Sequence, residues 1–506
     1  MGQMNAGPRG PFFYVHLVIG IFMMFFFGRV AIHFSTGEYV ADSYGVLEYV
    51  PAFAPLTDVG MQVVGIFLGV IWLWCFVGFL WPSLFALVAL GLSDFAGFAR
   101  IMEMSFGHNV AVLLLFSMIL FGSPQHVGAT RYITRFFLTR KVFNNRPIVF
   151  AFVFFFATYA LSVAVNVTPS LILMWTVLYG VLNELGYKKG ERFTSLMLIG
   201  TFLGSISGQA SLPFTGSTLA ILSVFNTAAD TAMPVPQYML LGFIYTVVGL
   251  VAYCFFMKLI LKPEELTKVA HVNTELFEKD PLPPMSRLQK ANFVSILGFV
   301  FLMLLPWALS EESALRGLLN HIGATGVAIL LTAIMCIMRV EGKPVLDFEA
   351  VASKAINWNV FVMVAAAMAI ASALTNPATG VIDMMIIVFN PVLGGHSPIM
   401  YFVVMLLVGI FVTSFASSMV IGIALMPILV AFGVEAGANL YAVAATTTLL
   451  LHYSIILPSA SVFAAMLWSN SDWITGKEVF KYGAVIVTIA VVAGIGIIMP
   501  ISLLLF

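Results

Sequence analysis

The chain has 506 residues, of which 61% are apolar and only 9% charged, and its formal net charge is zero. Soluble domains carry about 25% charged residues because their surfaces meet water, so lipid must cover most of the surface of this chain. The balanced charge gives no basic surface of the kind that binds nucleic acid. The sequence contains no P-loop, no His-Glu-x-x-His and no Gly-x-Ser-x-Gly elbow, which argues against an ATP-driven pump and against an enzyme.

Apolar runs long enough to cross a bilayer follow one another along most of the chain. The first, at 12–33, follows a short N-terminus without a small-residue cleavage site, so we interpret it as a retained helix and not as a signal peptide. Residues 1–55 are predicted to form this N-terminal transmembrane helix and an external loop. Further runs lie at 60–80, 82–99, 108–122, 148–183, 193–225, 237–261, 291–308, 322–338, 357–374, 397–431, 440–467 and 482–505.

The positions of Lys and Arg predict the orientation of these runs, because short cytoplasmic loops retain positive charge. The connections at 131–146, 188–192 and 258–290 are rich in Lys and Arg, and we assign them to the cytoplasm. The connections assigned to the outside contain neither residue; they are 34–57, 225–237, 375–397 and 432–440. The chain is therefore predicted to be a multi-pass protein of the inner (cytoplasmic) membrane, with its N-terminus in the cytoplasm and its C-terminus outside.

Two of the runs are predicted to be re-entrant hairpins. Basic connections flank 148–183 on both sides, so both its ends face the cytoplasm, and its middle at 165–170 reads Val-Asn-Val-Thr-Pro-Ser. The run 397–431 is the mirror image, because neither flank is basic and its middle at 413–418 reads Thr-Ser-Phe-Ala-Ser-Ser. The first hairpin is expected to enter from the inside and the second from the outside.

An interrupted span follows each predicted hairpin. The first break, at 204–218, contains Pro213 among Gly and Ser residues, and the second, at 454–461, contains Pro458. Proline removes a backbone donor and clashes with the preceding turn. Non-helical backbone at membrane depth is tolerated only where protein or a water-filled cavity satisfies it, so both breaks are expected to lie inside the protein.

The chain thus divides into two halves that repeat one pattern in opposite orientations. The first, 56–262, is predicted to hold scaffold helices, the basic arm, the inner hairpin and a broken helix. A cytoplasmic linker at 263–290 joins it to the second half, 291–506, with scaffold helices, the outer hairpin, a broken helix and a last span. Interrupted segments at matching places in two halves indicate the binding site of a secondary transporter.

At these residues the chain resembles the divalent anion:sodium symporter family, within the ion transporter superfamily. That family carries Ser-Asn-Thr at its hairpin tips, ahead of a proline. Here 417–419 reads Ser-Ser-Met before Pro427, and 165–167 reads Val-Asn-Val. The family's broken helices carry small polar residues after a proline, which 215–218 and 459–461 match.

The resemblance implies an all-α polytopic membrane protein of about 11 transmembrane helices plus two re-entrant hairpins, arranged as inverted-topology repeats. It also implies a homodimer and an elevator-type movement of a transport domain against a scaffold. In such a protein sodium ions are held by hairpin tips and unwound backbone, beside a small carboxylate. No other cofactor is implied.

Polar residues at the tips and breaks are the candidate ligands, and interhelical hydrogen bonding is the simpler alternative for each hydroxyl. The predicted substrate-binding residues are Asn166, Thr168, Gln209, Ser211, Thr215, Ser417, Ser418, Ser459 and Ser461. The predicted sodium ligands are Asn166, Gly208, Ser414, Ser417 and Ala460.

The tips depart from the family pattern, since Ser418 replaces an Asn, and Val167 and Met419 replace Thr. These changes make the site more apolar. They favour a monocarboxylate, a sulfonate or a larger amphiphilic anion over a dicarboxylate, and the sequence does not choose among these three.

His452, six residues before Pro458, is a candidate proton site, because an imidazole changes charge near neutral pH. A hydrogen-bonded interior histidine is the simpler interpretation.

Sodium-coupled transport of a small organic anion is the first hypothesis for the function of the chain. Proton coupling, anion exchange and a role as the membrane subunit of a multi-component transporter remain alternatives.

Overall fold

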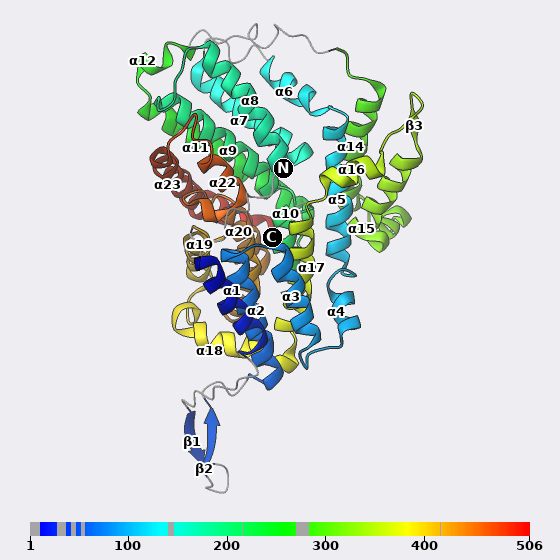
Figure 1. Ribbon diagram of the computed structural model, residues 1–506, viewed down its shortest axis with the longest axis vertical. Helices are drawn as coiled ribbons and strands as arrows, with labels where there is room; N and C mark the ends of the chain where they lie inside the picture. Colours follow the sequence, from blue (N-terminus) through cyan, green and yellow to red (C-terminus); the bar gives the residue numbers. More distant parts are fainter. Residues whose placement is uncertain are drawn as a thin grey trace.

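The structure is a computed structural model, and it describes residues 11–27, 37–41, 47–51, 56–139, 146–214, 216–269, 283–414 and 416–506. Nearly all of this is helix (Figure 1). Eight helices among the described residues are long and apolar enough to cross a membrane, or nine if one bent pair counts as a single span. The predicted all-helical membrane fold is confirmed. The expected number of about eleven spans is larger than eight or nine because it includes shorter and broken helices, which are too short to be counted as spans by their length alone.

The N-terminal region adds a feature that the sequence analysis did not predict. Helix α1 (Pro11–Phe25) packs on α2 (Asp58–Phe76). In the stretch of chain that connects these two helices, β1 (Gly37–Ala41) and β2 (Leu47–Pro51) form an antiparallel hairpin with Tyr39 opposite Tyr49. The hairpin projects from one end of the molecule (Figure 1).

The rest of the first half follows the expected order. The next helices are α3 (Leu80–Gly91), α4 (Phe98–Met104), α5 (Asn109–His126) and α6 (Thr130–Leu138). Helix α6 belongs to the basic arm and packs against α7. The two halves of the run 148–183 are α7 (Pro147–Val165) and α8 (Val167–Glu184), which pack side by side with Asn166 between them. This run therefore folds as a helical hairpin, and its re-entry from the cytoplasm stays a prediction.

The first broken span consists of α9 (Arg192–Ala210) and α10 (Gly216–Ala228), and α11 (Val235–Ile260) follows it. Every residue of α9 from Phe193 to Ala210 is buried. A helix that is buried all round lies in the core of a large protein. Because α9 packs against α7, α8, α11 and α23, it forms the centre of a group of helices that contains the inner hairpin α7–α8; we call this group the hairpin-bearing body.

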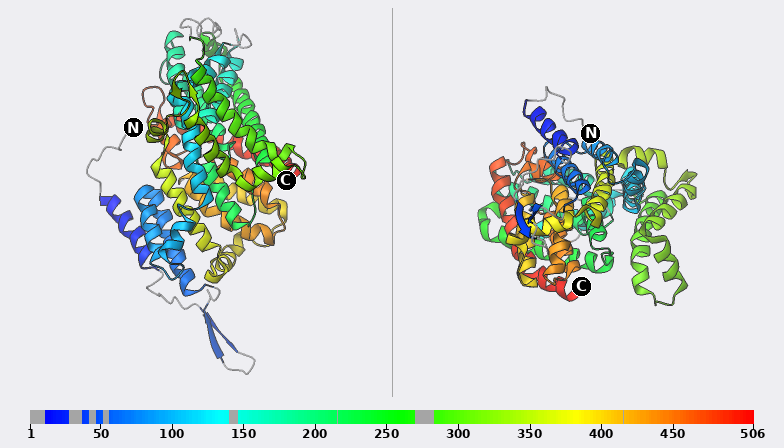
Figure 2. Two further views of the ribbon diagram at one scale, coloured as in Figure 1. Left: turned by 90° about the vertical axis from the view of Figure 1, so that its right-hand side faces the viewer. Right: turned by 90° about the horizontal axis from the view of Figure 1, so that it is seen from below.

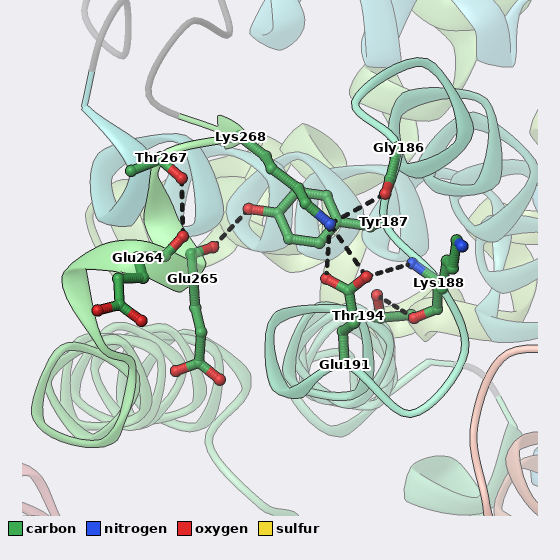
Figure 3. Close-up of polar contacts among 9 residues, drawn as sticks. All are labelled: Gly186, Tyr187, Lys188, Glu191, Thr194, Glu264, Glu265, Thr267 and Lys268. Atoms are coloured by element: carbon green, nitrogen blue, oxygen red, sulfur yellow. Dashed lines mark hydrogen bonds and ion pairs between the residues drawn. The ribbon is translucent and has the colours of Figure 1, made fainter.

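A polar network ties the start of the linker to the connection between α8 and α9 (Figure 3). Lys268 donates to both carboxylate oxygens of Glu191 and to the Gly186 carbonyl, each at 3.0 Å, and its ammonium lies 4.8 Å from the centre of the Tyr187 ring. The Tyr187 hydroxyl donates to the Glu265 carbonyl at 2.6 Å. Burial, with the neighbouring carboxylates, raises the pKa of the Tyr187 phenol, so that it stays protonated.

The linker itself begins with α12 (Pro263–Leu266), and 270–282 lie outside the described residues. The second half opens with α14 (Arg287–Ala308) and α15 (Ala314–Ile337), which is kinked at Gly323. A short β3–β4 hairpin (Arg339–Val340, Lys343–Pro344) precedes α16 (Phe348–Ala355) and α17 (Trp358–Leu374), a pair bent by 76°.

The remaining elements again form a hairpin followed by a broken span. After the 3-10 turn η3 (Pro377–Thr379) and α18 (Val381–Leu393), the outer hairpin is α19 (Pro398–Thr413) and α20 (Ser418–Glu435). The second broken span comprises α21 (Leu440–Leu451), the 3-10 turn η4 (Pro458–Ala460) and α22 (Val462–Trp468). The chain ends with α23 (Gly476–Ala493), a π-helical turn (Gly494–Ile498) and α24 (Met499–Leu505).

Candidate functional site

The inner hairpin turns on a single residue. Asn166 has φ 107° and ψ 163°, a backbone conformation that costs a non-glycine residue roughly 1–3 kcal/mol. Its side-chain Oδ1 accepts a hydrogen bond from the Val167 amide at 2.7 Å, at the start of α8. Thr168 follows and is half-buried. A strained residue at a predicted binding position, with its amide group at a helix N-terminus, fits a functional role for this tip.

Hydroxyl groups fasten the inner tip to α9. Ser162 donates to the Ser205 carbonyl at 2.6 Å, and the hydroxyls of Ser170 and Ser205 are also hydrogen-bonded. A Cβ on Gly208 would lie 2.6 Å from the Cβ of Ser162. Gly208, a predicted sodium ligand, therefore also serves a packing role, because it lets α9 approach the hairpin closely.

The break between α9 and α10 carries an unsatisfied acceptor. Gln209 is 6% exposed, and its Nε2 donates to the Ser217 hydroxyl at 3.2 Å. Its Oε1 is buried and has no hydrogen-bond partner in the described part of the chain. Ser211 donates to the Ser207 carbonyl at 2.8 Å, and Thr215 lies outside the described residues. Within the described part of this break the Gln209 oxygen therefore lacks a protein donor, and such an acceptor is costly to bury unpaired.

The outer hairpin has a longer turn between its helices. Ser414 donates to the Ile410 carbonyl at 2.8 Å, which leaves its oxygen lone pairs available. Ser417 is the N-cap of α20, and its side chain makes no capping hydrogen bond with the described residues. Ser418 and Met419 are both buried. The positive end of the α20 dipole therefore meets the tip without a capping side chain from Ser417.

The second break lies against the outer tip. Ser454 donates to the Thr413 carbonyl, the last residue of α19, at 2.7 Å. Ser461 caps α22 by accepting from the Ala464 amide at 3.0 Å, so its hydroxyl already has a structural partner. Ala460 is fully buried, and nothing is described for the Ser459 side chain. Ser461, although predicted to bind substrate, therefore has a structural role as the N-cap of α22.

His452 joins the two breaks, and sequence reasoning did not identify its partners. Its Nδ1 donates to the Thr448 carbonyl at 2.8 Å, since a carbonyl can only accept. Its Nε2 lies 2.9 Å from the Ser217 hydroxyl and 3.1 Å from the Thr218 hydroxyl, at the start of α10. The Thr218 hydroxyl donates to the Gln209 carbonyl at 2.8 Å. The predicted residues Gln209 and His452 thus meet through two hydroxyls that the sequence left unassigned.

Helix ends from both halves of the chain lie at the tips and breaks. Helices α8, α10, α20 and α22 begin at the tips and breaks, whereas α7, α9, α19 and α21 end there. Helix α10 packs on both α20 and α21. N-terminal helix ends favour anions, and free carbonyls at C-terminal ends suit a hard cation such as sodium. In the described part of the chain no three His, Cys, Asp or Glu side chains gather to hold a metal ion.

Comparison with known proteins gives one family and several solved structures of similar fold, two of which are described here. Residues 40–505 match the family model described as the sodium:sulfate symporter transmembrane region. MtrF of Neisseria gonorrhoeae, whose structure is presented as illuminating a class of antimetabolite efflux pumps, is 15% identical, with 98% of this chain and 95% of that chain covered and a TM-score of 0.54. The YdaH transporter of Alcanivorax borkumensis is 11% identical, with 97% of each chain covered and a TM-score of 0.53. No curated protein matches the sequence.

Proposed function

The chain belongs to the sodium:sulfate symporter transmembrane family and is a membrane-embedded secondary transporter, and from this premise we propose that it carries a small organic anion together with sodium. The anion is a carboxylate or a related group, and the membrane is the cytoplasmic membrane. The movement is of the elevator type, in which the hairpin-bearing body travels against scaffold helices. The two solved relatives are too distant in sequence to transfer a substrate.

The observation that carries this proposal is the contact between the two helix breaks through His452 and Ser217, with the outer tip hydrogen-bonded to the second break and the inner hairpin hydrogen-bonded to α9. Each tip presents a helix N-terminus, and the α20 end has no side-chain cap from Ser417. An anion there is stabilised by helix dipoles and hydroxyls, and a sodium ion beside it by carbonyl and hydroxyl oxygens. In this proposal Asn166, Ser414 and Ser417 contribute to the sodium shells, and Ser418 and Gln209 face the anion.

The apolar tip residues support a singly charged or amphiphilic anion. Val167 is fully buried and Met419 is 8% exposed, at the positions where the family pattern carries Thr. Burying a second carboxylate beside them without a paired donor would be costly. A monocarboxylate or a sulfonate therefore fits these tips better than a dicarboxylate.

The repeated order of hairpin and broken span supports the proposed division into inverted repeats at 56–262 and 291–506. We extend the proposal to a homodimer on the basis of family membership. The outward-facing C-terminus and inward-facing N-terminus follow from the distribution of Lys and Arg.

Proton coupling is a second candidate, and the contacts of His452 favour it. A proton on Nε2 would turn this nitrogen from an acceptor into a donor toward Ser217. The Ser217 hydroxyl would then need a new acceptor, which the unpaired Gln209 Oε1 supplies if the amide turns over. The chain His452–Ser217–Gln209 can thus exist in two hydrogen-bonded states that differ by one proton.

The test is the thermal stability of the purified protein with small anions, in sodium or in choline. A ligand that binds only the folded state stabilises it by RT ln(1 + [L]/Kd), about 2.7 kcal/mol at one hundred times Kd. Stabilisation by monocarboxylates or sulfonates that requires sodium is the expected result. Stabilisation that is the same in sodium and in choline and changes with pH would favour proton coupling. No change in stability with any anion would contradict both sodium-coupled and proton-coupled transport of an anion.

A further inference from the structure

A cavity outside the hairpin tips separates the α14–α15 pair from the hairpin-bearing body. It has a volume of about 370 Å³. Helices α14 and α15 form one wall, and the segment from Phe214 to Val235 forms the other. The α14–α15 pair stands at one edge of the molecule (Figure 2, right), and α15 packs inward on α5. The cavity therefore lies between an outlying helix pair and the broken helix of the transport site.

Two helix irregularities open this space. Gly323 has φ 60° and interrupts α15, and Pro306 lies inside the last turn of α14. A proline removes one backbone hydrogen bond and bends its helix, and a glycine at positive φ redirects the chain. Both residues line the cavity. The space is thus built into the backbone and does not depend on one side-chain rotamer.

The walls are mostly apolar, and Asn320 and Arg316 are the polar side chains among the lining residues. Met303, Leu319 and Phe214 are among the apolar lining residues, and the Phe214 ring packs on Phe299. Arg316 is the one Lys or Arg among the described lining residues. From Arg316 to Gly323 is seven residues, a rise of roughly 10 Å along a helix. The cavity is therefore long enough to hold part of an alkyl chain while its charged end stays at Arg316.

The Arg316 side chain has donors to spare. One nitrogen donates to the Leu309 carbonyl at 3.1 Å, and the other lies 3.5 Å from the Glu311 carboxylate, which is 90% exposed. A guanidinium carries five N–H donors in a fixed fork that suits phosphate and carboxylate oxygens. An ion pair with a carboxylate as exposed as that of Glu311 contributes little to stability, so a bound anion can take the place of Glu311 beside Arg316.

We propose that this cavity binds one anionic phospholipid, with an acyl chain between α14–α15 and the 214–235 segment and its phosphate on Arg316. The bilayer is the source because the outer faces of α14 expose Leu297 and Phe301 to lipid, and α15 exposes Leu318. Trp307, which lines the cavity and is 53% exposed, lies at the end of α14, where tryptophans anchor to the headgroup layer. This site is separate from the hairpin tips, and the inference does not rest on the proposed transport activity.

Native mass spectrometry of the detergent-purified full chain tests the proposal, with phosphatidylglycerol and phosphatidylcholine of identical acyl chains added in equal amounts. We expect retained phosphatidylglycerol to exceed phosphatidylcholine. Arg316→Gln should weaken phosphatidylglycerol binding about tenfold, the loss expected for one charge-assisted contact. Ala324→Phe, which fills the cavity, should remove the retained lipid while Arg316 stays in place.

Arg339→Gln is the matched control, because Arg339 follows the other end of α15 and does not line the cavity. It should leave lipid retention unchanged. Equal retention of both lipids, or an Ala324→Phe variant that retains as much phosphatidylglycerol as the parent, would overturn the proposal. So would a free long-chain carboxylate that displaces the lipid completely at equal concentration, because the cavity would then be a site for soluble amphiphiles. A melting temperature within a few degrees of the parent shows that a variant is folded.

Discussion

The imidazole Nε2 of His452 lies 2.9 Å from the hydroxyl of Ser217, although the two residues are 235 positions apart in the chain. His452 stands at the end of α21 and Ser217 at the start of α10. Together with the contact of His452 with Thr218, this contact connects the broken helix of the first half with that of the second. Because neither break is a regular helix, each depends on such side-chain partners for its geometry.

The first prediction concerns the energy of this pair. We expect His452→Gln and Ser217→Ala each to lower stability by about 1–3 kcal/mol, because each leaves a buried polar group without its partner. The double variant should lose less than the sum, with a coupling energy of about 1 kcal/mol. Thermal unfolding of the parent, the two single variants and the double variant measures this coupling energy. The same cycle with Ser295→Ala, on α14, in place of Ser217→Ala should give no coupling. If the stability losses of His452→Gln and Ser217→Ala simply add, the contact between the two residues does not stabilise the protein.

A second prediction separates function from stability at the inner tip. Asn166→Gly removes the side-chain amide but tolerates φ 107°, so the melting temperature should stay the same or rise. Uptake by proteoliposomes should nevertheless fall at least about tenfold, if the amide contributes a charge-assisted contact to a bound ion. Full uptake by this variant would remove Asn166 from the site.

The outer tip allows a matched test with a smaller change. Ser418→Ala deletes one buried hydroxyl at the start of α20, and we expect a fall in sodium affinity or in anion affinity of about tenfold. Ser353→Ala on α16 makes the same chemical change at an exposed position and should leave uptake unchanged. Equal uptake in both variants would exclude the Ser418 hydroxyl from binding.

Glycines on α9 and α8 should respond in opposite directions to the same substitution. A Cβ on Gly204 would lie 2.3 Å from the Phe155 carbonyl oxygen, so Gly204→Ala must push the inner hairpin away, at a cost of about 1–3 kcal/mol. A Cβ on Gly180, within α8, would meet no described atom within 4 Å. Gly180→Ala should therefore raise stability by about 0.5–1 kcal/mol. Thermal denaturation in one detergent compares them, and similar shifts would contradict the packing of α7 on α9.

Stability should fall in acid because of His108, the N-cap of α5. Its Nδ1 accepts from the Val110 amide at 3.3 Å, and burial lowers the pKa of the imidazole below 6.5. The unfolded chain takes up the proton first, so this contribution to stability is complete at high pH and is lost as the pH falls through 6.5 toward the folded-state pKa. His108→Asn keeps an acceptor but cannot titrate.

Melting temperatures at pH 8 and pH 5.5 test this expectation. The parent should lose more stability between the two values than His108→Asn does. An identical loss in both proteins would show that other groups carry the acid sensitivity, because the variant differs only at the cap.

Much of this arrangement was predictable because polar residues and proline interrupt apolar runs at a few places. Asn166 within 148–183 and the Ser-rich turn at 413–418 predicted the hairpins, and Pro213 and Pro458 predicted the broken spans. Each signal is local, since a proline or a polar group at membrane depth forces a change of backbone wherever it stands. The ligand roles of the predicted residues remain predictions.

The features that the sequence did not predict depend on contacts between distant segments. No local pattern pairs His452 with Ser217, and the unpaired Gln209 oxygen becomes visible only when its neighbours are placed. The β1–β2 hairpin lies in a stretch without basic residues that was interpreted as a plain external loop. Gly208 was predicted to be a ligand, yet its closest neighbour is the Ser162 side chain, so its small size also matters for packing.

The complete burial of α9 sets a lower limit on the size of any moving unit. From Phe193 to Ala210 this helix touches protein on every side, so it has no free surface along which to slide or rotate alone. Any displacement of the inner hairpin must carry α9 with it, and a displacement of α9 must carry α11 and α23, which pack against it. If the protein moves by the proposed elevator mechanism, we expect the plane of slip to lie outside this group, where α10 meets α5 and α17 and where α11 meets α14. We therefore expect cross-links within the group to leave transport unchanged and cross-links across that plane to stop transport.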